Sequence, residues 1–117
     1  RLEMKGLSGE LVDGWYVDYA EEKSAKLERE GELGTISITV STTDATAQER
    51  AEKQVGTYQE EKQITTETIG DTTYVCVTVS PDQVILFADS SEGAIKIQTM
   101  FCELDAARAQ LEAFTIK

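Results

Sequence analysis

The sequence predicts an α+β fold: a mostly antiparallel β-sheet of about seven to nine strands, with one long helix after the fourth strand and a short C-terminal helix. Three observations predict it. Alternating apolar and polar residues recur in both halves of the chain, a helical repeat separates the halves after Asp44, and a second helical repeat lies near the end. The 117 residues contain one proline and no linker-like tract. We therefore expect a single domain over residues 1–117.

Four strands are expected before the long helix. They are a segment from Leu2 to the turn at residues 12–14, Trp15–Ala20, a stretch around Ala25 and Leu27, and Thr35–Val40. The last is the clearest, because Ile36, Ile38 and Val40 alternate with Thr and Ser. Its apolar side is expected to face the core.

The long helix is expected from about Ala45 to Glu61. Thr46 and Glu49 have the spacing of a capping box, in which each side chain bonds a backbone N–H near the helix start. Apolar residues then recur on one helical face at Ala47, Ala51, Val55 and Tyr58. Their small size predicts close packing against a sheet.

The second half predicts a four-strand meander followed by the short helix. The expected strands are Ile64–Ile69, Tyr74–Val79, Val84–Ala88 and a stretch through Ile95, Ile97 and Phe101; the helix carries Leu104, Ala107, Leu111 and Phe114, and an edge strand is expected at Thr115–Lys117. Residues 84–88 are apolar at every position, which predicts a central strand covered on both faces.

The composition excludes several classes of function. With 11 Lys+Arg against 22 Asp+Glu, the net charge is −11, so the chain would repel nucleic acids and anionic membranes. It has no histidine, which excludes a Ser-His-Asp triad, a Cys-His pair and histidine-containing zinc sites. We expect it not to be an enzyme.

No motif for a metal or a cofactor is present. Asp89-Ser90-Ser91-Glu92 lacks the alternating ligands and the glycine of a calcium loop, and Gly31 and Gly34 are isolated turn glycines rather than a phosphate loop. We expect no metal and no cofactor, with a weak calcium site as the minor alternative.

The aromatic cluster Trp15, Tyr16 and Tyr19 has two interpretations. It could stack a ligand or partner, but alternation favours Trp15 and Tyr19 as core residues between sheet and helix, with Tyr16 exposed on the other face. The residues expected to contact a partner or ligand are Tyr16, Asp18 and Tyr74.

The two cysteines, Cys76 and Cys102, could pair in an oxidising compartment. Alternation predicts that both face the same side of the sheet, with one strand between them, at roughly 9–10 Å. A disulfide needs Cα atoms within about 7 Å. Two separate, partly buried thiols are therefore the favoured interpretation.

Four segments resemble the PsbP-like α-β-α sandwich family: Gly14-Trp15-Tyr16-Val17, Gly34-Thr35-Ile36-Ser37-Ile38, Ile69-Gly70-Asp71-Thr72-Thr73-Tyr74 and Leu111-Glu112-Ala113-Phe114. The family often has Pro-Gly-Trp or Pro-x-Gly-Trp where this chain has Val12-Asp13-Gly14-Trp15. The resemblance covers most of the chain and is strongest to small bacterial extracytoplasmic lipoprotein domains. It implies the sandwich fold and carries no site residue over.

The leading hypothesis is a non-catalytic extracytoplasmic binding or interaction domain of a bacterial lipoprotein, with an unknown protein or small ligand as partner. The chain begins at Arg1, so we expect a fragment whose membrane tether lies outside this sequence. The alternative is an intracellular acidic protein-binding adaptor. An enzyme comes third, because it would need a strongly shifted carboxyl or tyrosine in a pocket.

Overall fold

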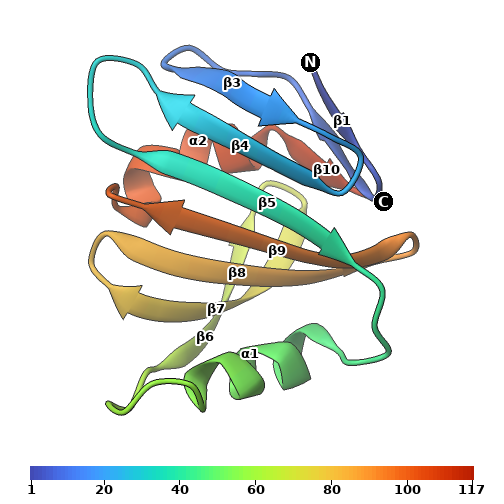
Figure 1. Cartoon of the computed structure of the whole chain (residues 1–117), viewed down its shortest axis with the longest axis vertical. Coiled ribbons are helices and arrows are strands. Elements are labelled where there is room, and N and C mark those ends of the chain that lie inside the picture. Colours follow the sequence, from blue (N-terminus) through green and yellow to red (C-terminus); the bar gives the residue numbers. More distant parts are fainter.

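The computed structural model describes all 117 residues and contains ten strands and two helices (Figure 1). In chain order the elements are β1 (Leu2–Met4), β2 (Leu7–Gly9), β3 (Trp15–Ala20), β4 (Ser24–Arg29), β5 (Thr35–Ser41), α1 (Ala47–Val55), β6 (Ile64–Ile69), β7 (Thr72–Ser80), β8 (Gln83–Ser90), β9 (Gly93–Met100), α2 (Leu104–Glu112) and β10 (Phe114–Ile116).

The strands form two antiparallel sheets. The large sheet has seven strands in the order β3-β4-β5-β9-β8-β7-β6, and the small sheet has three in the order β1-β2-β10. The α+β class and the meander from β6 to β9 are therefore confirmed. The strand count exceeds the expected range because the first expected strand is divided by a turn at Gly6, where φ is +85°. The central helix consequently follows the fifth strand rather than the fourth.

Strand β8 lies inside the large sheet and is buried on both faces, as its sequence predicts. Val84, Leu86 and Ala88 point into a large core, whereas Ile85 and Phe87 point into a smaller one on the opposite face. All five side chains are at most 4% exposed. Each face of this strand needs a separate covering layer, because exposed apolar area is unfavourable in water.

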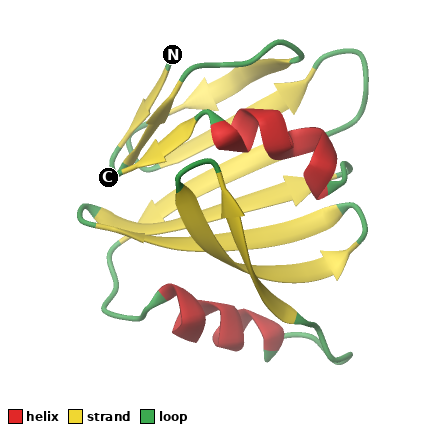
Figure 2. Cartoon of the chain, turned by 180° about the vertical axis from the view of Figure 1, so that it is seen from behind, coloured by secondary structure: helices red, strands yellow, loops and turns green.

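Different elements cover the two faces of the large sheet. The small sheet and α2 pack over the large core, which includes Leu2 and Leu7 from the small sheet and Leu111 from α2. Figure 2 shows α2 in front of the large sheet on this side. Helix α1 packs through Ala47 and Ala51 on the opposite face, against β7, β8 and β6.

Helix α1 starts where expected and ends earlier. The Thr46 hydroxyl accepts from the Glu49 N–H at 3.1 Å, and the Glu49 carboxylate accepts from the Thr46 N–H at 3.0 Å, so the capping box is confirmed. The expected end at Glu61 is wrong. The helix stops at Val55 because Gly56 is a poor helix former and the next N–H groups bond three residues back instead of four.

The close contact between α1 and the sheet predicts that enlarging Ala51 will be destabilising. Ala51→Leu should lower the free energy of unfolding by about 1–3 kcal/mol, because added methylenes must push the helix away from the sheet. Glu52→Leu is the control, since Glu52 is exposed on the same helix and should change stability by less than about 0.5 kcal/mol. Urea unfolding measures both, and an unchanged stability of Ala51→Leu would contradict the packing described.

Candidate functional site

Helix α1 covers only part of its side of the large sheet, and the rest forms an open face. In Figure 1 no helix or strand lies in front of β4, β5 and β9. The residues that point outward here, all partly or fully exposed, define the open face: Tyr16, Tyr19, Lys26, Glu28, Thr35, Ser37, Thr39, Lys96, Gln98 and Met100. Their side chains are mostly hydroxyls, amides and ammonium groups, which suit polar recognition.

Strand register places these polar groups in rows across the sheet. Ser37 of β5 pairs with Lys26 of β4 on one side and with Gln98 of β9 on the other. In the next row, Thr39 pairs with Lys96. Directly opposite side chains on antiparallel strands lie about 4.5–5.5 Å apart at Cβ, so each row presents several polar groups to one bound molecule.

A groove of about 260 Å³ lies between the open face and α1. We call it the α1 groove; its lining residues are Thr39, Ser41, Arg50, Lys53, Gln54, Thr57, Phe87 and Lys96. A shallow hollow of about 80 Å³ extends it over the open face and shares Thr39 and Lys96 with it. The groove therefore joins a helix side to a sheet face, with one aromatic ring among polar side chains.

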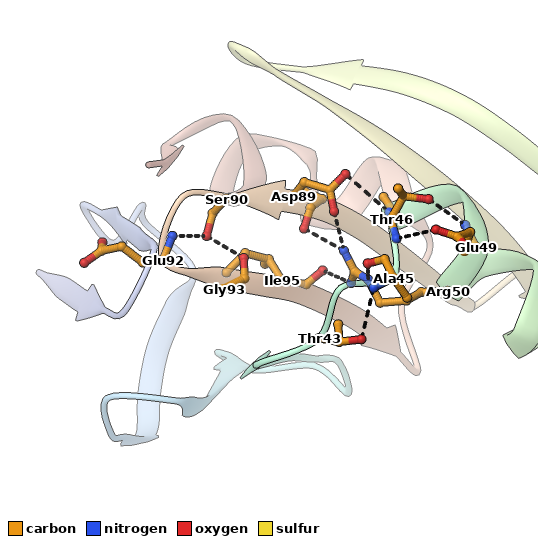
Figure 3. Close-up of polar contacts among 12 residues, drawn as sticks. Thr43, Ala45, Thr46, Glu49, Arg50, Asp89, Ser90, Glu92, Gly93 and Ile95 are labelled. Carbon is orange, nitrogen blue, oxygen red and sulfur yellow. Dashed lines mark hydrogen bonds and ion pairs between the residues drawn. The ribbon is translucent and has the colours of Figure 1, made fainter.

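Arg50 fastens α1 to the sheet beside this groove. Its guanidinium donates to the Ile95 and Ala88 carbonyls, both at 3.1 Å, and to the Asp89 carboxylate at 3.0 Å (Figure 3). A fourth bond reaches the Ala45 carbonyl at 3.3 Å. The same group lies 5.5 Å from the centre of the Phe87 ring, within cation–π range. Arg50 thus makes four hydrogen bonds, all within the fold.

Asp89 completes the fastening at the start of α1. Its second carboxylate oxygen accepts from the Ala47 N–H at 3.3 Å. The positive end of the helix dipole also stabilises a carboxylate at this position. The helix start is therefore held by Thr46, Glu49 and Asp89 together.

Lys53 and Lys96 differ from Arg50 because neither forms an ion pair in the structure. Lys26, the other cation of the open face, lies 3.7 Å from the Glu28 carboxylate. The α1 groove thus holds two uncompensated positive charges, and no acidic side chain lines it.

Tyr16 and Asp18, two of the three expected contact residues, are exposed on β3 at the edge of the large sheet. The Tyr16 hydroxyl donates to the Glu28 carboxylate at 2.8 Å. This hydrogen bond raises the pKa of Tyr16, with smaller contributions from desolvation and nearby carboxylates. Tyr16 belongs to the open face and Asp18 is the unpaired residue of the register shift in β3; because β4 and β5 separate β3 from β9, both lie outside the α1 groove.

Tyr74, the third, contacts no partner at the surface because its side chain is fully buried. It lies on β7, a strand covered on both faces, and its ring is part of the large core. Its hydroxyl has no hydrogen-bond partner. Burial raises the pKa of Tyr74 to about 12.

The expectation for the β3 aromatics is correct for Trp15 and wrong for Tyr19. Trp15 is 7% exposed and belongs to the large core, whereas Tyr19 is 45% exposed. The register with β4 shifts between Val17 and Tyr19, which marks a β-bulge. An extra residue reverses the alternation, so Tyr19 points to the open side.

Both cysteines are free and buried, as favoured. Cys102 lies beside Thr35 of β5, its Sγ 4.0 Å from the Thr35 carbonyl oxygen, whereas Cys76 is on β7 with β9 and β8 in between. Both belong to the large core and so lie on the same side of the sheet, as predicted, but two strands separate them instead of one, and Cys102 lies beyond β9, after Phe101 with φ of +59°, away from the face of Lys96. Burial raises the pKa of both thiols, that of Cys76 to about 11.

The residues of the α1 groove were not singled out from the sequence. Arg50 precedes its partner Asp89 by 39 positions, and the two meet only after the helix docks. One usable signal was present: α1 carries Arg50, Lys53 and Gln54 at helical spacing, with Thr57 just beyond its end, which describes a polar side next to the side of the buried alanines.

Comparisons with known protein families, curated proteins and solved structures give no match for this chain. Neither helix is long and apolar enough to cross a bilayer. No group of three or more cysteine or acidic side chains is arranged to hold a metal ion.

The four bonds of Arg50 predict that lysine cannot replace it. Arg50→Lys should lower the free energy of unfolding by about 1–3 kcal/mol, because one ammonium cannot reach all the acceptors that the guanidinium fork satisfies. Arg108→Lys is the matched control, since Arg108 bonds only side-chain carboxylates and should cost less than about 1 kcal/mol. Equal effects in urea unfolding would contradict the fastening role.

Burial of Cys76 and Tyr74 predicts a loss of stability in alkali. The unfolded chain releases these protons near the ordinary pKa values of 9.0 and 10.0, whereas the folded chain retains them to about 11 and 12. The unfolded state then binds fewer protons, so the free energy of unfolding should fall as pH rises from about 9 to 12.

Tyr74→Phe should remove the upper part of this fall and raise stability at pH 7 by about 1 kcal/mol, because it removes a buried hydroxyl without a partner. Urea unfolding at several pH values measures both effects. A steeper alkaline loss in the variant would contradict the assignment.

Proposed function

We propose that this chain is a non-catalytic extracytoplasmic binding domain of a bacterial lipoprotein, and that it takes a protein or small ligand on the open face of its large sheet. The observation that carries the proposal is that this face is uncovered. Antiparallel sheets often leave part of a face in water, and here polar rows and a groove occupy the uncovered part. Such a face offers many fixed hydrogen-bonding groups to a ligand.

The distribution of reactive groups supports binding over catalysis. The thiols and the tyrosine whose pKa values are most strongly raised lie in the core, and burial keeps them in their protonated, less nucleophilic forms. The open face and the α1 groove present hydroxyls, amides and lysines. These groups hold and orient a molecule through hydrogen bonds and charge.

The extracytoplasmic assignment rests on the resemblance to the PsbP-like sandwich. The order of strands, helix, meander and helix, with a large sheet between covering elements on its two faces, is consistent with that resemblance. The start of the precursor tests it: an apolar segment ending in Cys before Arg1 supports the lipoprotein, and a Met shortly before Arg1 with no such segment overturns it.

An intracellular acidic adaptor is the second candidate. It is favoured by the two free thiols, which reducing compartments maintain, and by the net charge of −11, which would attract a basic protein surface. The same precursor sequence decides between the two candidates.

The binding surface itself is testable by capture from a cell-envelope extract of the source organism. The wild type should retain specific proteins or small molecules, identified by mass spectrometry, and Ser37→Glu/Gln98→Glu should lose them because both changes alter the open face. Gln48→Glu/Gln59→Glu adds the same charge at exposed positions elsewhere. Identical capture by all three proteins would show that the open face is not the binding surface.

A further inference from the structure

The side of α1 that borders the groove carries a regular set of polar groups. Arg50, Lys53 and Gln54 lie on one side of the helix, and Thr57 follows two residues after its end at Val55. The sheet contributes Thr39, Ser41, Phe87 and Lys96 opposite them. Two separate elements therefore present hydrogen-bonding groups to the same space.

The charge of the groove is opposite to that of the chain. The chain carries twice as many acidic as basic residues, yet the groove lining has three cations and no carboxylate. Arg50 is balanced by Asp89 at 3.0 Å, which leaves Lys53 and Lys96 unpaired. An anionic group is the chemical class that these two ammonium groups would hold.

The groove also has an apolar component. Phe87 is one of its lining residues, with its ring centre 5.5 Å from the Arg50 guanidinium, and Thr39, Thr57 and the lysines contribute methyl and methylene groups to the lining. A volume of about 260 Å³ is slightly below the usual range of ligand pockets, about 300–1,000 Å³. The ligand that fits these properties is small and has one apolar part and one anionic group.

The anion is better described as a carboxylate than as a phosphate. Phosphate sites commonly use an arginine fork or the N–H groups at a helix start, with lysine as an added point charge. Here the fork of Arg50 is occupied by Asp89 and three carbonyls, and the start of α1 is capped by Thr46 and Asp89. Two point-charge ammonium groups with nearby hydroxyls remain.

We propose that the α1 groove binds a small organic carboxylate, with its apolar part against the aliphatic atoms of the lining beside the largely buried Phe87 ring and its carboxylate held by Lys53 and Lys96. The proposal rests on the proposed function, because it assigns a ligand class to one end of the open face. It also gives Gln54, Thr39 and Thr57 the role of hydrogen-bonding neighbours of that ligand.

The test uses 3-phenylpropionate as the probe and its neutral amide, 3-phenylpropionamide, as the uncharged match. Titration into ¹⁵N-labelled protein should give saturable NMR shifts at groove residues such as Thr39, Gln54 and Thr57. The carboxylate should bind about tenfold more tightly than the amide, equivalent to about 1.4 kcal/mol. Equal affinities, saturable shifts outside the groove, or no saturation would overturn the proposal.

Single variants test whether Lys53 and Lys96 hold the carboxylate. Lys53→Gln and Lys96→Gln should each weaken carboxylate binding several-fold and leave amide binding unchanged; neither side chain makes an ion pair, so both variants are expected to fold. Lys117→Gln is the matched control, because it removes the same charge from the end of the chain beside the small sheet and should bind as the wild type does. Equal weakening by Lys117→Gln would show a general charge effect and overturn the assignment.

Two further outcomes separate this proposal from the proposed function. Binding of inorganic phosphate without binding of 3-phenylpropionate would overturn the carboxylate class. Loss of envelope capture in Ser37→Glu/Gln98→Glu, together with no probe binding, would leave the open face as a binding surface and reject only the groove ligand.

Discussion

The structure depends on the burial of β8, whose side chains are apolar on both faces in the interior of a seven-stranded sheet. Fully burying one such side chain stabilises the fold by about 1.5–3 kcal/mol, so neither face could stay in water. The small sheet and α2 bury the face that carries Leu86. Helix α1 buries the face that carries Phe87. The alanines of α1 allow a close approach to the sheet, and Arg50 fixes the position of the helix.

The unequal size of these two covers produces the functional surface. The large core contains 21 buried residues and the small one contains five, so one cover extends over far more of the sheet than the other. An α-helix is about 10 Å wide, roughly two strand spacings, and α1 therefore covers little more than β7 and β8. The strands beyond have polar outer faces because nothing covers them, and the groove forms where helix and open face meet.

Features set by local pattern were predictable from the sequence. The alternation of Ile36 and Ile38, the apolar run at residues 84–88 and the capping box at Thr46 each depend on neighbours within a few positions. The bulge that exposes Tyr19 depends on register with β4, and the burial of Tyr74 depends on which strands become interior. The α1 groove was least predictable, because residues 39, 53, 87 and 96 come together only through tertiary packing.

The overall negative charge and a site for an anion are compatible because they act over different distances. At physiological ionic strength, screening weakens interactions between exposed charges beyond about 8 Å. A small anion in the groove therefore interacts mainly with Lys53 and Lys96, whereas a polyanion would meet the acidic surface along its whole length. The charge that argues against nucleic acid as a partner thus leaves room for a small carboxylate, and it would discourage larger anions from competing for the same groove.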